Sequence, residues 1–315
     1  MTRHLVIVGA TATGKSALAL ELARQLGDVE VVSLDAMQVY REMDIGTAKP
    51  SSEERAAVPH HLIDVADPAE EWSVRRTQDA VRDAIGDIER RGRRAILVGG
   101  TGLYVRAVVD DLAVPPADAA LRAELESDTN CAASLAAAYE RLRELDPTAA
   151  ARIEPANRRR IVRALEVIAA TGRPFSSFGP GLDQYGTPAM DARLIGLSVP
   201  ADEARRRIAE RFAAMTRRGL VDEVRALAAR SKGLGRTARQ AIGYKEVLMH
   251  LDGEIASLDD ALDLAIRRTR KFARRQRVWF RRDPRVEWFA DPEKLDSLAD
   301  AVLATWCIPT PTSSP

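Results

Sequence analysis

An eight-residue segment near the N-terminus has the residue types and the spacing of a phosphate-binding loop. It fits the pattern G-x-x-x-x-G-K-[ST] in full, and its members are Gly9, Ala10, Thr11, Ala12, Thr13, Gly14, Lys15 and Ser16. In such a loop the backbone N–H groups converge on phosphate oxygens at a helix N-terminus, where the helix dipole favours negative charge. Lys15 supplies a mobile positive charge, and Ser16 offers a hydroxyl to Mg²⁺. The segment predicts a site for a diphosphate or triphosphate without identifying the compound.

A carboxylate follows the second apolar segment of the chain, residues 29–33. The sequence there reads Ser33-Leu34-Asp35-Ala36-Met37-Gln38-Val39-Tyr40. Asp35 should lie at the carboxyl end of a strand, in the crevice where open α/β sheets bind ligands. It could ligate Mg²⁺, act as a general base, or cap a helix, and at this point all three roles remain open.

A glycine-rich segment follows a third apolar run and reads Gly99-Gly100-Thr101-Gly102. Glycines permit a close backbone approach, and the Thr101 hydroxyl would lie at the same sheet edge as the phosphate loop. Thr101 could equally be the N-cap of the helix that follows.

Two clusters of basic residues stand out in a chain whose net charge is only +1. Residues 267–282 contain nine Arg or Lys, of which Arg267, Lys271, Arg274 and Arg281 fall on one side of a helix. The second cluster is Arg158-Arg159-Arg160 with Arg163. Such runs are usually solvated helix faces, but two of them in a neutral protein favour a polyanionic partner.

These segments require elements that place them at one edge of a sheet. Residues 4–8, 29–33 and 94–98 are predicted strands, and residues 15–26 and 73–91 are predicted helices, with Ser73 as an N-cap. Another helix should start after Gly100. Alternation of strands and helices is typical of a parallel α/β sheet.

The pattern changes at Val114-Pro115-Pro116. Residues up to about 172 read as helices only, and residues 172–188 read as a loop with four glycines and three prolines. Residues 192–197 and 286–289 again read as strands. We therefore expect a helical insertion, residues 114–190, within an α/β core formed by residues 1–113 and 191–315, with a disordered tail at 309–315.

Composition narrows the class of protein. Hydrophobic residues make up 46% and charged residues 30% of the 315, which is a globular balance. The two cysteines, Cys131 and Cys307, have neither metal-ligand spacing nor a disulfide framework. No apolar run is long enough to span a bilayer. We expect a reduced, cytoplasmic protein that has no membrane partner and is a monomer.

Taken in order, these segments resemble the tRNA dimethylallyltransferase (tRNA isopentenyltransferase) family of the bacterial type along nearly the whole chain. The segments that carry the resemblance are GATATGKS, SLDAMQVYREMDIGTAKP, VPHHLIDV, ILVGGTGLYVRA, NRRRIVRALEVIAATGRP, QAIGYKE and TRKFARRQRVWFRRD. The resemblance implies a P-loop core with a helical insertion that grips the anticodon stem-loop. It also implies transfer of a dimethylallyl group from dimethylallyl diphosphate to N6 of the adenosine on the 3′ side of the anticodon, in tRNAs that read codons beginning with U.

The resemblance also implies roles for individual residues. Residues 11–16 would hold the diphosphate with Mg²⁺ on Ser16, Asp35 would contact the target amine, and Thr101 would lie at the reaction centre. Contacts to tRNA are implied for Asp35, Ala36, Met37, Gln38, Thr101, Arg122, Arg159, Arg160, Ile161, Val162, Arg163, Gln240, Ala241, Ile242, Gly243, Tyr244 and Lys245.

Three other functions compete with this interpretation. A small-molecule or nucleotide kinase is the first, because the same loop more often binds ATP. A prenyltransferase that acts on free nucleotides is the second, although the helical insertion and its arginines favour RNA. The third is a non-catalytic RNA-binding switch, which would leave Lys15, Ser16 and Asp35 unexplained.

Overall fold

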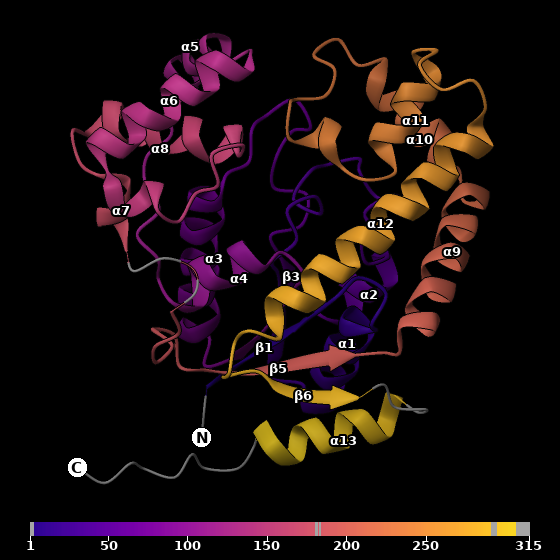
Figure 1. Ribbon diagram of the computed structural model, residues 1–315. Coiled ribbons are helices and arrows are strands. Elements are labelled where there is room, and N and C mark those ends of the chain that lie inside the picture. Colours follow the sequence, from indigo (N-terminus) through magenta and orange to yellow (C-terminus); the bar gives the residue numbers. More distant parts are fainter. Residues whose placement is uncertain (1–2, 180–181, 183, 291–294, 307–315) are drawn as a thin grey trace, which may run out of the picture. The chain divides into compact units, whose positions relative to one another are not determined.

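The computed structural model describes residues 3–179, 182, 184–290 and 295–306. The chain forms two compact units: residues 1–111 with 187–315 make unit 1, and residues 112–186 make unit 2. Figure 1 shows the helices and strands along the chain. No described helix is both long and apolar enough to cross a membrane.

Unit 1 is built on a six-stranded sheet in which every strand pair is parallel. The strand order is β3-β2-β4-β1-β5-β6. The strands are β1 (His4–Gly9), β2 (Val29–Ser33), β3 (His60–His61), β4 (Arg94–Gly99), β5 (Ala192–Ser198) and β6 (Glu287–Ala290). β1 is paired with β4 and β5 at its two edges, and helices cover both of its faces, which explains the continuous apolar run in its sequence.

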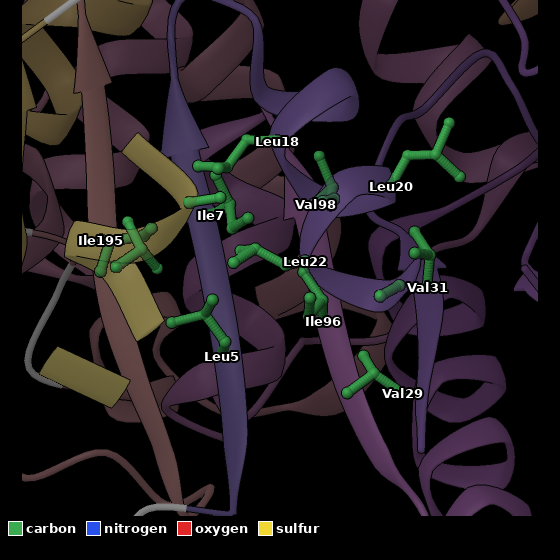
Figure 2. Close-up of a cluster of buried hydrophobic side chains, with 14 of the residues drawn as sticks. Leu5, Ile7, Leu18, Leu20, Leu22, Val29, Val31, Ile96, Val98 and Ile195 are labelled. Atoms are coloured by element: carbon green, nitrogen blue, oxygen red, sulfur yellow. The ribbon is translucent and has the colours of Figure 1, made fainter. Parts of the chain in front are cut away.

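One face of this sheet packs against α1 (Lys15–Leu26) and α13 (Leu295–Trp306). Leu5 and Ile7 of β1 point to this face and meet Leu18 and Leu22 of α1, as Figure 2 shows. Trp306 of α13 is fully buried in the same cluster. The cluster holds α1 against the strands, and the start of α1 follows the phosphate loop in the chain.

The other face packs against α3 (Val74–Arg90), α4 (Gly102–Val109) and the end of α12 (Leu258–Phe280). Val6 and Val8, which alternate with the residues of the first face, point here together with Phe280 of α12. Apolar clusters therefore cover both faces of the sheet.

The remaining helices of unit 1 form further apolar clusters with the loops that follow β2. They are α9 (Ala201–Arg217), α10 (Leu220–Ala228), α11 (Tyr244–Leu251) and the short 3₁₀ helix η2 (Ala238–Gln240), whereas α2 (Ser52–Ala57) has no buried residue. Tyr40 and Tyr244 are fully buried in one of these clusters.

Unit 2 is helical and has a core of its own. Its elements are α5 (Ala119–Asp128), α6 (Ala132–Leu145), α7 (Pro147–Ala150), α8 (Arg158–Thr171) and the 3₁₀ helix η1 (Phe175–Phe178). Leu125, Leu142, Ile161 and Leu165 meet in this core. The Asn157 side chain caps α8 by accepting a hydrogen bond from the backbone N–H of Arg160, and Gly172 ends the helix with a φ of 68°.

The structure confirms the predicted parallel α/β class and the helical character of the segment after residue 114. The Ser73 cap is confirmed as well, since its side chain accepts from the N–H of Arg76. The expected loop at 172–188 contains η1, and its residues 180, 181 and 183 lie outside the described part of the chain. The tail at 309–315, predicted to be disordered, also lies outside it.

Candidate active site

The phosphate loop leaves β1 at Gly9 and ends where α1 begins at Lys15. Gly14, the N-cap of α1, has a φ of 88°, a conformation that suits glycine. A Cβ at Gly9 would come within 2.6 Å of the Leu197 carbonyl oxygen on β5. Gly14 thus allows a left-handed turn, and Gly9 allows β1 and β5 to lie close together.

A cavity of about 450 Å³ lies over this loop, entirely within unit 1. Residues 11–17 line one part of it, while Ser33, Asp35 and Gly100 come from the carboxyl ends of β2 and β4. Its size is that of a small-ligand site. The phosphate loop and Asp35, far apart in the sequence, are therefore brought to one cavity.

Besides Lys49, two cations line this cavity, Lys15 of α1 and Arg211 of α9. Lys15 Nζ donates to the Ala10 carbonyl at 2.6 Å, and Arg211 Nη1 donates to the Thr11 hydroxyl at 3.2 Å. Burial, reinforced by the charge of Arg211 and opposed by that of Asp35, lowers the pKa of Lys15 to about 8. Burial likewise lowers the pKa of Arg211, with Asp35 opposing. Both cations carry an electrostatic cost that an anion in the cavity would relieve.

Buried cations elsewhere in unit 1 are paired with carboxylates. Lys49 Nζ contacts Asp44 Oδ1 at 2.5 Å and Asp64 Oδ1 at 2.6 Å. Among the described residues, neither Lys15 nor Arg211 forms such an ion pair. Both side chains are half-buried, and because an unpaired charge that is shielded from water is costly, they make the cavity favourable for an anion.

Asp35 has one carboxylate oxygen engaged and one free. Its Oδ1 accepts from the backbone N–H of Met37 at 2.8 Å and of Gln38 at 3.3 Å. Its Oδ2 has no hydrogen-bond partner among the described residues. No helix begins after Asp35, so the helix-capping role considered for it is wrong: its Oδ1 instead stabilises the turn at residues 36–39 and leaves the second oxygen without a partner there.

Hydrogen bonds and apolar packing hold the three residues after Asp35 in place. Gln38 accepts from the Ser33 hydroxyl at 2.9 Å, and its Nε2 donates to the carbonyls of Thr47 and Ala48. Ala36 and Met37 are half-buried and pack on the cluster around Tyr40. The amide of Gln38 therefore supports the cavity wall formed by residues 47–50.

Thr101 is the N-cap residue of α4, but its hydroxyl makes no capping hydrogen bond. It is half-buried and follows Gly100, which lines the cavity. The glycines around it have steric causes: a Cβ at Gly100 would lie 2.4 Å from Gln276 Nε2, and one at Gly102 would lie 2.1 Å from Trp279 Nε1. Because these glycines have no side chain, Gln276 and Trp279 of α12 can pack against them.

Sequence reasoning missed several residues that line the cavity, among them Lys49, Arg211, Phe272 and Gln276. Phe272 and Gln276 lie within the basic run on α12, and only the fold brings them to the cavity. Arg211 lies in the arginine-rich α9, where no spacing distinguishes it from its neighbours.

The segment from Gln240 to Lys245, expected to touch tRNA, is mostly interior. Ala241, Gly243 and Tyr244 are buried, and Ile242 is half-buried. The Tyr244 hydroxyl donates to Glu223 Oε1 at 2.5 Å; burial first and then the charge of Glu223 raise the pKa of that hydroxyl. Gln240 and Lys245 remain nearer the surface and are hydrogen-bonded to each other.

The basic face of α12 is unneutralised. Arg267, Lys271, Arg274 and Arg281 are exposed, and none pairs with an acid in the described chain. The arginines of α9 differ, since Arg206 contacts both Glu203 and Glu210 at 2.6 Å. The surface around Arg206 on α9 is therefore neutralised, whereas the basic face of α12 leaves positive charge exposed.

In unit 2 the predicted contacts divide into two groups. Arg159 and Arg160 are exposed and have no ion pair among the described residues. Arg122 and Arg163 instead bind the fully buried Glu166, at 2.9 Å and 2.8 Å. Burial alone would raise the pKa of Glu166, but these hydrogen bonds outweigh it and lower the pKa. Ile161 and Val162 belong to the core of this unit.

Family models match this chain over most of its length. The model described as IPP transferase matches residues 38–283, and the one described as Isopentenyl transferase matches residues 2–65. The tRNA dimethylallyltransferase of Geobacter metallireducens is 46% identical over 303 residues, which cover 96% of this chain and 97% of the relative. The tRNA dimethylallyltransferase of Streptomyces coelicolor is 49% identical, with 94% of each chain covered.

Solved structures give the same result. The full-length tRNA isopentenylpyrophosphate transferase from Bacillus halodurans matches with a TM-score of 0.69 at 39% identity, covering 97% of both chains. A eukaryotic dimethylallyltransferase described as acting on tRNA matches with a TM-score of 0.79 at 27% identity, covering 96% of this chain and 78% of that one. The names of these relatives do not favour the kinase interpretation of the phosphate loop.

Proposed function

Because this chain belongs to the IPP transferase family, we propose that it transfers a dimethylallyl group from dimethylallyl diphosphate to N6 of the adenosine on the 3′ side of the anticodon. The observation that carries the proposal is the cavity in which two unpaired cations, Lys15 and Arg211, lie near the carboxylate of Asp35. The cations would stabilise the diphosphate, which becomes more negative as it leaves. The carboxylate would accept the proton that the amine loses.

The diphosphate would lie on residues 11–16. The backbone N–H groups at the start of α1, with Lys15 and Arg211, would stabilise the charge that grows as the bond between C1 and the diphosphate oxygen breaks. Leu20, Val31 and Ile63, which also line the cavity, would contact the five-carbon chain.

The residues present suit Mg²⁺. Ser16 is exposed at the start of α1, and the described residues contain no group of three or more His, Cys, Asp or Glu that could hold a metal. Mg²⁺ commonly keeps several waters and binds through few protein ligands plus substrate phosphates. Ser16 would therefore hold the ion together with the diphosphate. When bound, the ion would neutralise part of the charge on the leaving group.

The adenine amine is a weak nucleophile because its lone pair is delocalised into the ring. As N6 bonds to C1, the electrons of the breaking C1–O bond leave with the diphosphate, and the N6 proton passes to Asp35 Oδ2. The Thr101 hydroxyl, free of a capping bond, would contact the adenine at the reaction centre.

The RNA would be bound through its backbone. Arg267, Lys271, Arg274 and Arg281 of α12 would contact phosphates, as would Arg159 and Arg160 of unit 2. Unit 2, expected from the sequence at residues 114–190, would grip the anticodon stem-loop. Unstacking the adenine costs on the order of a few kcal/mol, which these backbone contacts would offset. Cytoplasmic location and a monomeric state remain predictions.

The test is to incubate the protein with tRNA transcripts, Mg²⁺ and dimethylallyl diphosphate, and to digest the RNA for nucleoside mass spectrometry. The expected result is N6-dimethylallyladenosine in transcripts that carry adenosine 3′ to the anticodon, with one diphosphate released per transfer. A transcript with guanosine at that position is the matched control. Release of phosphate from ATP, with no prenylated nucleoside, would overturn the proposal.

A further inference from the structure

A buried amide on α12 joins the two loops that enclose the cavity. Gln276 is only 6% exposed, and both ends of its side-chain amide are used. Its Oε1 accepts from the backbone N–H of Thr11 at 2.9 Å, and its Nε2 donates to the carbonyl of Gly100 at 2.8 Å. One side chain therefore links the phosphate loop after β1 to the Gly100–Thr101 segment after β4.

We infer that Gln276 is a positioning residue that sets the phosphate loop against Thr101, and so aligns the prenyl donor with the acceptor amine. The inference rests on the proposed function, in which residues 11–16 hold the donor and Thr101 meets the adenine. A carboxamide is the group that suits this place, because it offers one acceptor and one donor to two backbone groups.

The residues around the Gln276 amide leave room for its two hydrogen bonds. Gly100 has no side chain, and a Cβ there would lie 2.4 Å from Gln276 Nε2, so any other residue would displace the amide. Thr11 is also held from a second side by Arg211, whose guanidinium donates to its hydroxyl. The first residue of the expected diphosphate loop thus depends on α9 and α12, two helices that contact each other.

The helix that carries Gln276 also carries the exposed, unpaired Arg267, Lys271 and Arg274. In Figure 1, α12 runs from α11 and α9 toward β1 and α4, and it contacts all four elements. The basic face that would contact RNA and the amide that holds the donor loop are therefore on one continuous helix.

Kinetics distinguish positioning from general stability. Gln276→Met removes both hydrogen bonds at similar volume, and Gly100→Ala displaces the amide from the opposite side. Gln78→Met is the matched control: Gln78 is also a buried amide, 5% exposed, whose Nε2 donates to the Ala107 carbonyl at 3.0 Å, and it does not line the cavity. All three variants would be assayed at one temperature with a stem-loop RNA, after correction for the folded fraction.

The expected result is a fall in kcat of about tenfold for Gln276→Met and for Gly100→Ala, since small misplacements of reacting groups are costly. KM for the RNA should stay within about threefold. Gln78→Met should keep kcat within about twofold. The inference is overturned if neither Gln276→Met nor Gly100→Ala lowers kcat at least threefold more than Gln78→Met does. Failure of the wild-type protein to transfer the prenyl group would instead refute the proposed function.

Discussion

Binding of the prenyl donor should depend on pH through Lys15. The pKa of this ammonium group in the ligand-free protein is lowered to about 8, mainly by burial and next by the charge of Arg211. A bound diphosphate would favour the charged form and raise that pKa, so binding takes up a proton when the pH is above 8. The affinity for the prenyl donor should therefore be highest below pH 8 and should fall as the pH rises above 8.

The size of the effect comes from the protonated fraction. Lys15 with a pKa of about 8 is about nine-tenths charged at pH 7 and about one-tenth charged at pH 9. If the donor binds the charged form alone, its dissociation constant rises about tenfold between these two values. The assay is calorimetric titration with dimethylallyl diphosphate without RNA, from pH 6.5 to 9.5, in buffers of different ionisation enthalpy so that proton uptake is counted directly.

Two variants test the physical cause. In Lys15→Arg the guanidinium stays charged throughout the range, so the affinity should become nearly independent of pH even if it is weaker. In Arg211→Met the neighbouring charge is gone, so the pKa of Lys15 should rise and the loss of affinity should move to higher pH. A wild-type affinity that is flat from pH 7 to 9.5, or a Lys15→Arg profile as steep as that of the wild type, would refute the reasoning.

Three further predictions concern the base, the RNA surface and the cavity wall. Asp35→Asn should abolish prenyl transfer while RNA affinity, measured by filter binding, stays within about threefold; transfer at a normal rate would show that another group takes the proton. Arg274→Ser should weaken RNA binding and reduce the slope of log affinity against log salt by about 1, whereas Arg206→Ser, which removes a paired arginine of α9, should leave that slope unchanged. Glu223→Ala should lower the free energy of unfolding in urea by about 2 kcal/mol, because three backbone N–H groups and the Tyr244 hydroxyl lose their acceptor; a change below about 0.5 kcal/mol would contradict this.

Elements with strong local signals could be predicted from the sequence. The helix at residues 15–26 and the strand at residues 29–33 match the structure residue for residue, because glycines bound the helix and a short apolar run forms the strand. The phosphate loop was predicted for the same reason, since all its members are adjacent in the chain. The fold class followed from the alternation of such segments.

Elements formed by pairing across the chain could not be predicted in this way. The two-residue strand β3 (His60–His61) has no apolar pattern, and it exists because it pairs with Val31 and Val32 of β2. His61 Nε2 also contacts the buried Glu30 of β2 at 2.6 Å. The strand order depends on the same kind of long-range contact, which no local period records.

The basic clusters show a second limit of sequence reasoning. Arg122 and Arg163 were predicted to touch tRNA, and the structure places both against the buried carboxylate of Glu166. Arg159, which lies in the same helix as Arg163, has no such partner in the part of the chain that the structure describes. A run of arginines in a sequence does not distinguish charges neutralised inside the protein from charges left for a ligand, since that depends on which acids the fold brings near.

The polar residues that meet at the cavity lie far apart in the sequence. Thr11 meets Arg211 across 200 positions of the chain and Gln276 across 265. Lys49 and Lys15 both line the cavity, yet Lys49 has two carboxylates beside it, whereas Lys15 has a carbonyl oxygen and lies near the like charge of Arg211. Two cations that lie close together without such partners favour an anion beside them. The phosphate-binding motif predicts that such an anion binds at the same place, and in the proposed reaction the diphosphate of the prenyl donor would supply the negative charge.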